Sequence, residues 1–279
     1  MMTAALQPKE EGQVAGLRRQ VQLVSRLSGM LFTIGEGFVI AARHGALTRP
    51  NQPHHTKLVQ YFCRRMCRVL GVQVQVHGEI PRTHALWVSN HVSWIDIPVI
   101  GSVTRVFFLS KAEVAQWPLM GRLARAGGTL FIKRGSGDSD AVRNQIASFL
   151  QQKMPVLFFP EATTTDGKQV RRIHGRLLAA ALETHTPIQP VVLCYASPAG
   201  ILDQIVPFIG DASFADHLQQ VLAHHQPVIA HVMALAPIET TGHDIHSLTN
   251  RVQQQMREGL QQLHAKVLSV PVEIHHATT

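Results

Sequence analysis

A histidine and an aspartate five positions apart, His91 and Asp96, are the two residues of this sequence best suited to acid–base chemistry. An imidazole can take a proton from an alcohol, and a nearby carboxylate can hold the ring in one tautomer and stabilise its charged form. Five residues along a regular helix place two side chains on different faces, so the pair works only if His91 lies on the turn before a helix. Because the chain contains 17 histidines, the spacing alone is more typical of a surface histidine or one that caps a strand end.

A cationic pair, Lys133 and Arg134, directly follows the apolar run 130–132. A guanidinium at that position can bind a phosphate or a carboxylate through two parallel hydrogen bonds. The alternative is an ordinary solvated strand end.

A carboxylate and a run of threonines follow another apolar run, residues 156–159, where Glu161 precedes Thr163 and Thr164. Open α/β sheets bind their ligands beyond the carboxyl ends of the strands. These three residues are therefore candidates for substrate contacts, with a simple strand-to-loop exit as the alternative.

The elements that position these residues alternate between short apolar runs and helical stretches. Residues 72–76, where apolar and polar residues alternate, are expected to form a half-buried strand. The apolar runs expected to form strands are 85–88, 106–109, 130–132, 156–159, 191–193 and 228–234. A helix capped by Asp138 lies between two of them, and residues 246–267 form a closing helix. The alternation predicts an α/β fold, with one domain over residues 71–268 and a largely parallel central sheet flanked by helices.

Two amphipathic helices are predicted before this domain, within residues 16–70. The first carries apolar residues three or four positions apart, at Leu17, Val21, Val24, Leu27, Leu31, Ile34 and Phe38. The second, residues 56–70, carries Arg64, Arg65 and Arg68. Such helices either lie on a membrane surface or pack on the core, and the pattern leaves both open. Residues 1–15 and 269–279 are predicted to be flexible tails.

The overall charge restricts the partners of the chain. With 26 Lys and Arg against 18 Asp and Glu, the net charge is +8, so the protein prefers anionic lipid, an acidic protein or nucleic acid. No helix-turn-helix, zinc-finger or RNA-binding signature supports the last of these. Three cysteines indicate a reducing compartment, and Cys63 and Cys67 are more typical of core thiols than of zinc ligands.

No segment is expected to cross the membrane or to act as a signal peptide. Residues 18–43 come nearest to a transmembrane helix but contain Arg26 and Glu36, and residues 1–15 lack a compact apolar region.

Taken together and in this order, four motifs within about residues 70–200 resemble the glycerolipid acyltransferase family, which includes the 1-acylglycerol-3-phosphate acyltransferases. The first motif is Asn90-His91 with Asp96, and the second is Gly-x-x-Phe-Ile-x-Arg, ending at Arg134. The third, Phe-Pro-Glu-Gly-Thr-Arg-Ser, is matched from Phe159 to Thr163, and the fourth is a proline–valine strand at residues 190–191. The ordered set is far more specific than any single motif.

The resemblance implies an O-acyltransferase that moves a fatty acyl group from an acyl thioester to the free hydroxyl of a lysolipid, by direct transfer in a ternary complex. His91 is then the general base and Asp96 its support. The same resemblance places substrate contacts at Asn90, Lys133, Arg134, Glu161, Thr163 and Thr164. The donor is the thioester of acyl carrier protein or of coenzyme A, with no bound cofactor and no metal. The expected location is the cytoplasmic face of the inner membrane, on an anionic surface.

Two departures from the family pattern bear on the acceptor. Ala162 replaces a glycine, and Thr164 replaces the arginine that usually binds phosphate. This variant resembles the branch with lyso-ornithine lipid and lysophospholipid acyltransferases, so lyso-ornithine lipid and 1-acyl-sn-glycerol-3-phosphate both remain candidate acceptors. A non-catalytic lipid-binding adaptor on the same fold is the alternative function.

Overall fold

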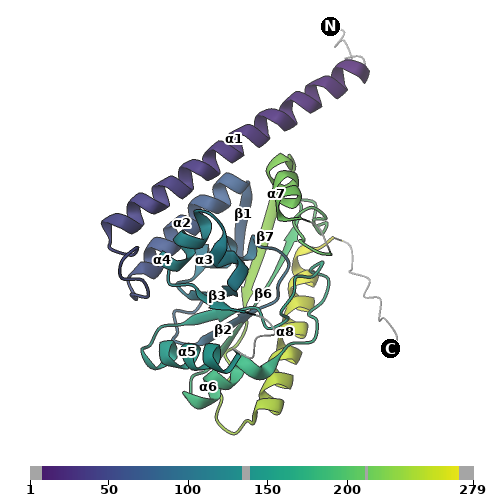
Figure 1. Cartoon of the computed structure of the whole chain (residues 1–279). Coiled ribbons are helices and arrows are strands. Elements are labelled where there is room, and N and C mark those ends of the chain that lie inside the picture. Colours follow the sequence, from purple (N-terminus) through teal and green to yellow (C-terminus); the bar gives the residue numbers. More distant parts are fainter. Residues whose placement is uncertain (1–7, 134–138, 211–212, 270–279) are drawn as a thin grey trace.

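A seven-stranded sheet forms the centre of the protein (Figure 1). The structure is a computed structural model and describes residues 8–133, 139–210 and 213–269. The strands are β1 (Val72–His77), β2 (Leu86–Ser89), β3 (Phe107–Lys111), β4 (Leu130–Ile132), β5 (Val156–Phe158), β6 (Ile188–Ala196) and β7 (Val228–Ala234). They lie in the order β1-β7-β6-β2-β5-β3-β4, and of the paired strands only β6 and β7 run antiparallel. The predicted α/β class with a largely parallel sheet is confirmed.

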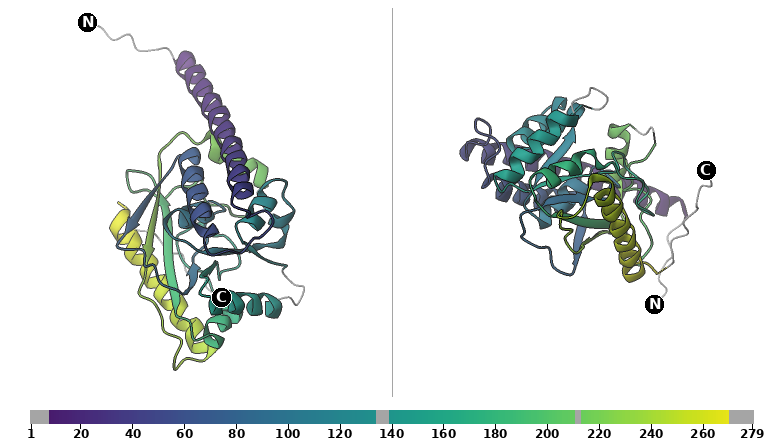
Figure 2. Two further views of the ribbon diagram at one scale, coloured as in Figure 1. Left: turned by 90° about the vertical axis from the view of Figure 1, so that its left-hand side faces the viewer. Right: turned by 90° about the horizontal axis from the view of Figure 1, so that it is seen from below.

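Helices cover both faces of the sheet (Figures 1 and 2). They are α1 (Pro8–Arg43), α2 (His55–Leu70), α3 (Asp96–Val103), α4 (Met120–Ala126), α5 (Ser139–Gln151), α6 (Ala179–Glu183), α7 (Phe214–Ala223) and α8 (Ile245–Val267), with short 3-10 helices η1 (Ala112–Gln116) and η2 (Gly175–Leu178). One core joins the sheet to α5, α6 and α8, and the other joins it to α1, α2, α3 and α7.

The strand residues alternate between these two cores. On β2, Leu86 and Val88 face the α5–α8 side, whereas Trp87 between them faces the α2–α3 side. On β5, Val156 and Leu157 divide in the same way. Neighbouring side chains of a strand point to opposite faces, so a sheet covered on both sides needs continuous apolar runs. This requirement explains why strands such as β2 and β5 appear in the sequence as short apolar runs.

The first helix begins earlier than expected. α1 starts at Pro8, so residues 8–15, which were expected to belong to a flexible tail, are helical; residues 1–7 lie outside the described part. Proline is favoured at the first position of a helix, because its fixed backbone angle suits the helix and its missing N–H is not needed there.

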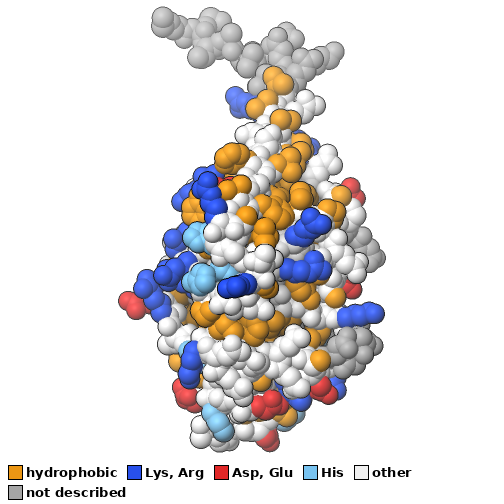
Figure 3. Space-filling view, turned by 60° about the vertical axis from the view of Figure 1, so that its left-hand side comes forward, with side chains coloured by type: hydrophobic (Ala, Val, Ile, Leu, Met, Phe, Trp, Pro, Cys, Tyr) orange, Lys and Arg blue, Asp and Glu red, His pale blue; other side chains and the backbone are white. Residues whose placement is uncertain are grey.

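Most of the predicted apolar stripe of α1 points away from the protein. Leu17, Val21 and Val24 are 63%, 61% and 60% exposed, and Phe32 is 67% exposed, whereas Ile34 lower on the helix is buried. Figure 3 shows hydrophobic side chains along this helix, with Lys and Arg beside them. By length and composition, Gly16–Arg43 is apolar enough to cross a membrane, contrary to our expectation from its charged residues.

The opposite face of α1 carries polar residues that hold it to the domain. Arg26 Nη1 donates to the carbonyls of Val221 and His224, at 3.1 and 2.7 Å, and Gln22 donates to the second of these. These carbonyls belong to the C-terminal end of α7, where helix carbonyls lack partners within the helix. Arg26 therefore fixes α1 on the domain while its apolar face stays exposed.

Candidate active site

His91 lies on the turn between β2 and α3, as the pairing with Asp96 requires. Asp96 is the first residue of α3, and its Oδ2 lies 2.7 Å from His91 Nδ1. The aspartate is fully buried, whereas the histidine side chain is 19% exposed. Because Nδ1 donates to the carboxylate, Nε2 is the ring nitrogen that can take a proton from a substrate.

Asp96 accepts three further hydrogen bonds. Its Oδ2 also accepts from the backbone N–H groups of Val92 and Ser93, at 2.7 and 3.0 Å. Its Oδ1 accepts from the hydroxyl of Tyr195 on β6, at 2.7 Å. Burial and the adjacent charge of Asp96 raise the pKa of Tyr195 well above its usual range, so this hydroxyl remains a donor. A buried carboxylate needs such compensation, and here it is fixed in one orientation towards His91.

The loop after β5 holds the backbone of His91 from both sides. Glu161 Oε1 accepts the His91 N–H at 2.9 Å, and the N–H of Thr165 donates to the His91 carbonyl at 2.8 Å. The imidazole also stacks on the ring of Phe159, with centroids 3.9 Å apart. The first and third motifs therefore form one structural unit, although about 70 residues separate them in the sequence.

The Glu161 side chain is almost fully buried, and its carboxylate oxygens accept hydrogen bonds from backbone N–H groups. Its second oxygen accepts the N–H of Arg171 at 2.7 Å. Burial raises its pKa to about 7, an effect opposed by the two backbone hydrogen bonds. Glu161 was expected to contact the substrate, but the structure makes it a brace for the His91 loop.

Asn90 was also expected to contact the substrate, but it too is buried, and its side-chain amide is hydrogen-bonded to the backbone. Its side-chain amide donates to the Leu193 carbonyl and accepts the Leu193 N–H, both at 2.9 Å. It thereby joins the end of β2 to β6 and sets the start of the turn that carries His91.

A cavity of about 720 Å³ opens beside His91, at the carboxyl ends of β3, β4 and β5. Of the predicted contact residues, Lys133, Thr163 and Thr164 line it, while Arg134 lies outside the described residues. Lys111 and Arg176 add two further cations. No Asp or Glu is among the lining residues that the structure describes. The cavity is therefore suited to an anionic ligand.

The two departures from the family pattern have structural counterparts. Ala162 has a φ of +59°, in the left-handed region where glycine is favoured. Thr164 donates its hydroxyl to the Phe208 carbonyl. Thr164 therefore braces the loop around residue 208 and brings no positive charge to the cavity.

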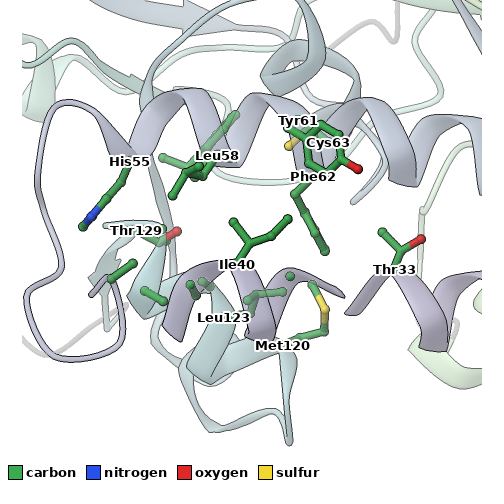
Figure 4. A pocket seen from close by; sticks show the side chains of 18 of the residues that line it. Thr33, Ile40, His55, Leu58, Tyr61, Phe62, Cys63, Met120, Leu123 and Thr129 are labelled. Atoms are coloured by element: carbon green, nitrogen blue, oxygen red, sulfur yellow. The ribbon is translucent and has the colours of Figure 1, made fainter. Parts of the chain in front are cut away.

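A second, apolar pocket of about 130 Å³ lies between α1, α2 and α4 (Figure 4). Ile40, Leu58, Phe62 and Leu123 are among its lining residues. Ile97 of α3 lines both this pocket and the cavity beside His91. The two spaces are therefore neighbours.

Two residues of this site were not predicted from the sequence motifs. Tyr195 and Arg176 lie on β6 and η2, about 100 and 85 residues after His91, and neither belongs to the motif positions considered. A polar residue within the apolar run of a buried strand was the available signal for Tyr195. For Arg176 the sequence held no signal beyond its charge.

The cysteine thiols are not among the residues that line the cavity beside His91. Cys63 and Cys67 are buried, and burial raises the pKa of Cys67 to about 12. Within the described residues, no group of three or more His, Cys, Asp or Glu side chains is arranged to hold a metal ion.

The fold and the site define an α/β protein with a histidine–aspartate pair at the carboxyl edge of its sheet, and comparison with known proteins names the family. The family model Acyltransferase matches residues 72–194. The lyso-ornithine lipid O-acyltransferase of Pseudomonas aeruginosa is 44% identical over 208 residues, which cover 75% of this chain and 80% of that protein. Its namesake from Rhodobacter capsulatus is 32% identical over 229 residues, covering 81% and 82%. The chain belongs to the acyltransferase family, as the motifs indicated, and is an acyltransferase enzyme.

A solved structure shares the fold. The crystal structure of the 1-acyl-sn-glycerophosphate acyltransferase from Thermotoga maritima superposes with a TM-score of 0.66 over 90% of this chain and 98% of that one, at 19% identity.

Proposed function

We propose that the protein transfers a fatty acyl group from an acyl thioester to the free hydroxyl of a lysolipid. The observation that carries this proposal is the His91–Asp96 pair, 2.7 Å apart, at the head of a cavity with cationic walls. A hydroxyl group needs a base to become a nucleophile, and a lysolipid with an acidic head group needs positive charge to bind.

His91 acts as the base in this proposal. The acceptor hydroxyl gives its proton to Nε2 while its oxygen attacks the carbonyl carbon of the thioester, and Asp96 stabilises the imidazolium. The tetrahedral intermediate then collapses, the carbon–sulfur bond breaks, and the leaving thiolate takes the proton from His91. The products are an ester and a free thiol, and the donor is acyl carrier protein or coenzyme A carrying the acyl chain.

The acyl chain needs an apolar space next to the reacting carbonyl. The pocket between α1, α2 and α4 meets this need, because Ile97 borders both it and the cavity beside His91. Burial of each methylene contributes about 0.8 kcal/mol, so this pocket supplies affinity for the chain.

Lyso-ornithine lipid is the acceptor that the relatives favour. The two proteins above act on it by name, and both align over about four-fifths of their length. A 1-acyl-sn-glycerol-3-phosphate acyltransferase of Neisseria meningitidis is 30% identical over 140 residues, covering 55% of that protein.

The exposed apolar face of α1 is proposed to bind the membrane that holds the acceptor. Leu31 and Phe32 are 53% and 67% exposed on this face, and Arg64 and Arg68 of the neighbouring helix are exposed as well. Apolar burial in the lipid interface and attraction to anionic head groups act together on such helices. The thioester donors are cytoplasmic, so the cytoplasmic face of the inner membrane is the expected location.

An acyl-transfer assay tests the enzyme proposal. Labelled acyl carrier protein and coenzyme A thioesters are offered with lyso-ornithine lipid, lysophosphatidate and neutral lysolipids. We expect transfer by the wild type and at least a 100-fold loss in His91→Ala, with no loss in His246→Ala, an exposed histidine of α8. Equal transfer by wild type and His91→Ala overturns the mechanism, and no transfer by folded wild type with either donor supports a lipid-binding adaptor.

Liposome sedimentation tests the membrane proposal. The double variant Leu31→Glu/Phe32→Glu places two charges on the exposed face and is expected to remain in the supernatant. Its control, Gln261→Glu/Gln262→Glu, adds the same charge on the exposed side of α8. Equal sedimentation of the two variants contradicts the role of α1.

A further inference from the structure

An arginine that the family motifs do not include reaches the cavity beside His91. Arg176 lies on η2, lines this cavity, and donates from Nη1 to the hydroxyl of Ser139 at 2.7 Å. Ser139 is the first residue of α5 and also lines the cavity. The bond therefore steers the guanidinium towards the cavity. A guanidinium has five N–H donors, and this bond uses one of them.

The charges around Arg176 favour an anion as its ligand. The ionisable side chains that line the cavity from the surrounding elements are His91, Lys111 of β3, Lys133 after β4 and His174. Among the described lining residues there is no carboxylate that could neutralise Arg176 inside the cavity. Positive charge concentrated in a concave site raises the local concentration of anionic ligands.

The other arginines near the third motif do not take this place. Arg171, Arg172 and Arg176 are all exposed, but Arg171 and Arg172 do not line the cavity, and the backbone N–H of Arg171 donates to Glu161. Thr164 stands where the family has an arginine, and its hydroxyl is directed to the Phe208 carbonyl. Arg176 is thus the arginine that the described structure brings to the cavity, and it comes from a different element.

We propose that Arg176 binds the carboxylate of an amino-acid lysolipid and so selects the acceptor. The inference rests on the proposed function, because it names the residue that holds the acceptor of that reaction. A planar guanidinium matches a carboxylate through two parallel N–H···O bonds, an arrangement that a lysine cannot make. With the carboxylate held at η2, the lysolipid hydroxyl is free to reach His91 across the same cavity.

A chemical change in the acceptor, paired with a change in Arg176, tests this contact. Wild type, Arg176→Ala and Arg176→Lys are assayed with lyso-ornithine lipid and with its carboxyl methyl ester. We expect Arg176→Ala to raise the KM for the acid roughly 10- to 100-fold while kcat changes less, and Arg176→Lys to recover part of the loss. The KM for the ester should be the same in wild type and Arg176→Ala. Arg172→Ala is the matched control and should leave both values unchanged.

Two results overturn the proposal. One is an unchanged KM for the acid in Arg176→Ala, and the other is an equal rise for acid and ester, which indicates a loss of structure. Lysophosphatidate is assayed separately. If Arg176→Ala raises the KM for lysophosphatidate more than the KM for lyso-ornithine lipid, Arg176 is assigned to phosphate binding instead.

A binding measurement keeps this test independent of turnover. Trp94 and Trp117 line the cavity, so their fluorescence reports on a ligand placed there. Titration with lyso-ornithine lipid should give a Kd that rises roughly 10- to 100-fold in Arg176→Ala but not in Arg172→Ala. If wild type shows no acyl transfer but the Kd still differs between wild type and Arg176→Ala, the acyl-transfer proposal alone is overturned. Equal Kd values for the two proteins overturn the role of Arg176.

Discussion

Replacing Tyr195 with phenylalanine removes one hydrogen bond from the carboxylate that supports His91. Tyr195 is 2% exposed, and its hydroxyl donates to Asp96 Oδ1 at 2.7 Å. The other three bonds to Asp96 all end on Oδ2. The variant therefore leaves Oδ1 buried without a donor among the described residues while the contact with His91 persists.

The size of the effect follows from this difference between the two oxygens. A hydrogen bond to a charged group contributes about 1.5–3 kcal/mol to stability. A buried charged oxygen that is left without its donor costs this whole amount. For a protein of this size, that loss corresponds to a fall in Tm of about 3–5 °C. Because Oδ2 still holds His91, Val92 and Ser93, we expect kcat to fall only about tenfold, equivalent to about 1.4 kcal/mol in the transition state.

The assay is thermal unfolding together with acyl-transfer kinetics. The chain has only one other tyrosine, Tyr61, whose hydroxyl donates to Glu36 at 2.7 Å on the surface. Tyr61→Phe removes the same atom and should change the free energy of unfolding by less than about 0.5 kcal/mol. If Tyr195→Phe matches Tyr61→Phe in both Tm and kcat, the support of Asp96 by Tyr195 is refuted.

Three further predictions concern other parts of the molecule. The pKa of Glu161 is raised from 4.5 to about 7, so the folded state holds its proton more tightly than the unfolded chain does. The resulting stability is lost as pH rises from about 4.5 to about 7, and Glu161→Gln should flatten this slope in unfolding measured against pH. Arg26→Gln removes the donor to the end of α7 and should lower the unfolding free energy by about 1–2 kcal/mol, with faster hydrogen exchange in residues 16–30; unchanged exchange contradicts the anchoring role. Ala124→Leu fills the apolar pocket and should reduce the length of the longest acyl chain that the enzyme accepts from a donor. Ala42→Leu, at an exposed position of α1, should leave that length unchanged.

The strands could be predicted because their residues face a core on both sides. A strand such as β2, which packs Leu86 and Val88 into one core and Trp87 into the other, appears in the sequence as an uninterrupted apolar run. The direction of α1 could not be predicted in the same way. An apolar stripe indicates that a helix has two different faces, but not which of them meets the protein. Here Arg26 and Gln22 bind the end of α7, and the apolar side is left outside.

Within the site, the sequence predicted the pairing of His91 with Asp96 but not the contacts of the neighbouring motif residues. Asn90 and Glu161 belong to the motifs, yet both use their polar atoms on the backbone, of Leu193 in one case and of His91 and Arg171 in the other. Their presence in a motif is explained by the turn they hold. A motif records which residues are required together and does not distinguish a contact with substrate from a contact with the chain.

The arginines near the site show the same limit of motif-based prediction, because here a residue outside the motifs lines the cavity. Arg171, Arg172 and Arg176 are close in sequence and equal in charge, but only the last lines the cavity. The change of direction from an extended segment into η2, which begins at Gly175, brings the guanidinium of Arg176 to the cavity, and Ser139 of a separate helix accepts its hydrogen bond. The loss of an arginine at position 164 therefore does not measure the loss of positive charge in the site. Comparison with the family pattern position by position predicts a weakened anion site. In the folded structure, however, a guanidinium lines the cavity from η2 instead of from position 164. In the role that we propose for Arg176, the acceptor is selected by where this charge lies relative to His91, and that position follows from the fold.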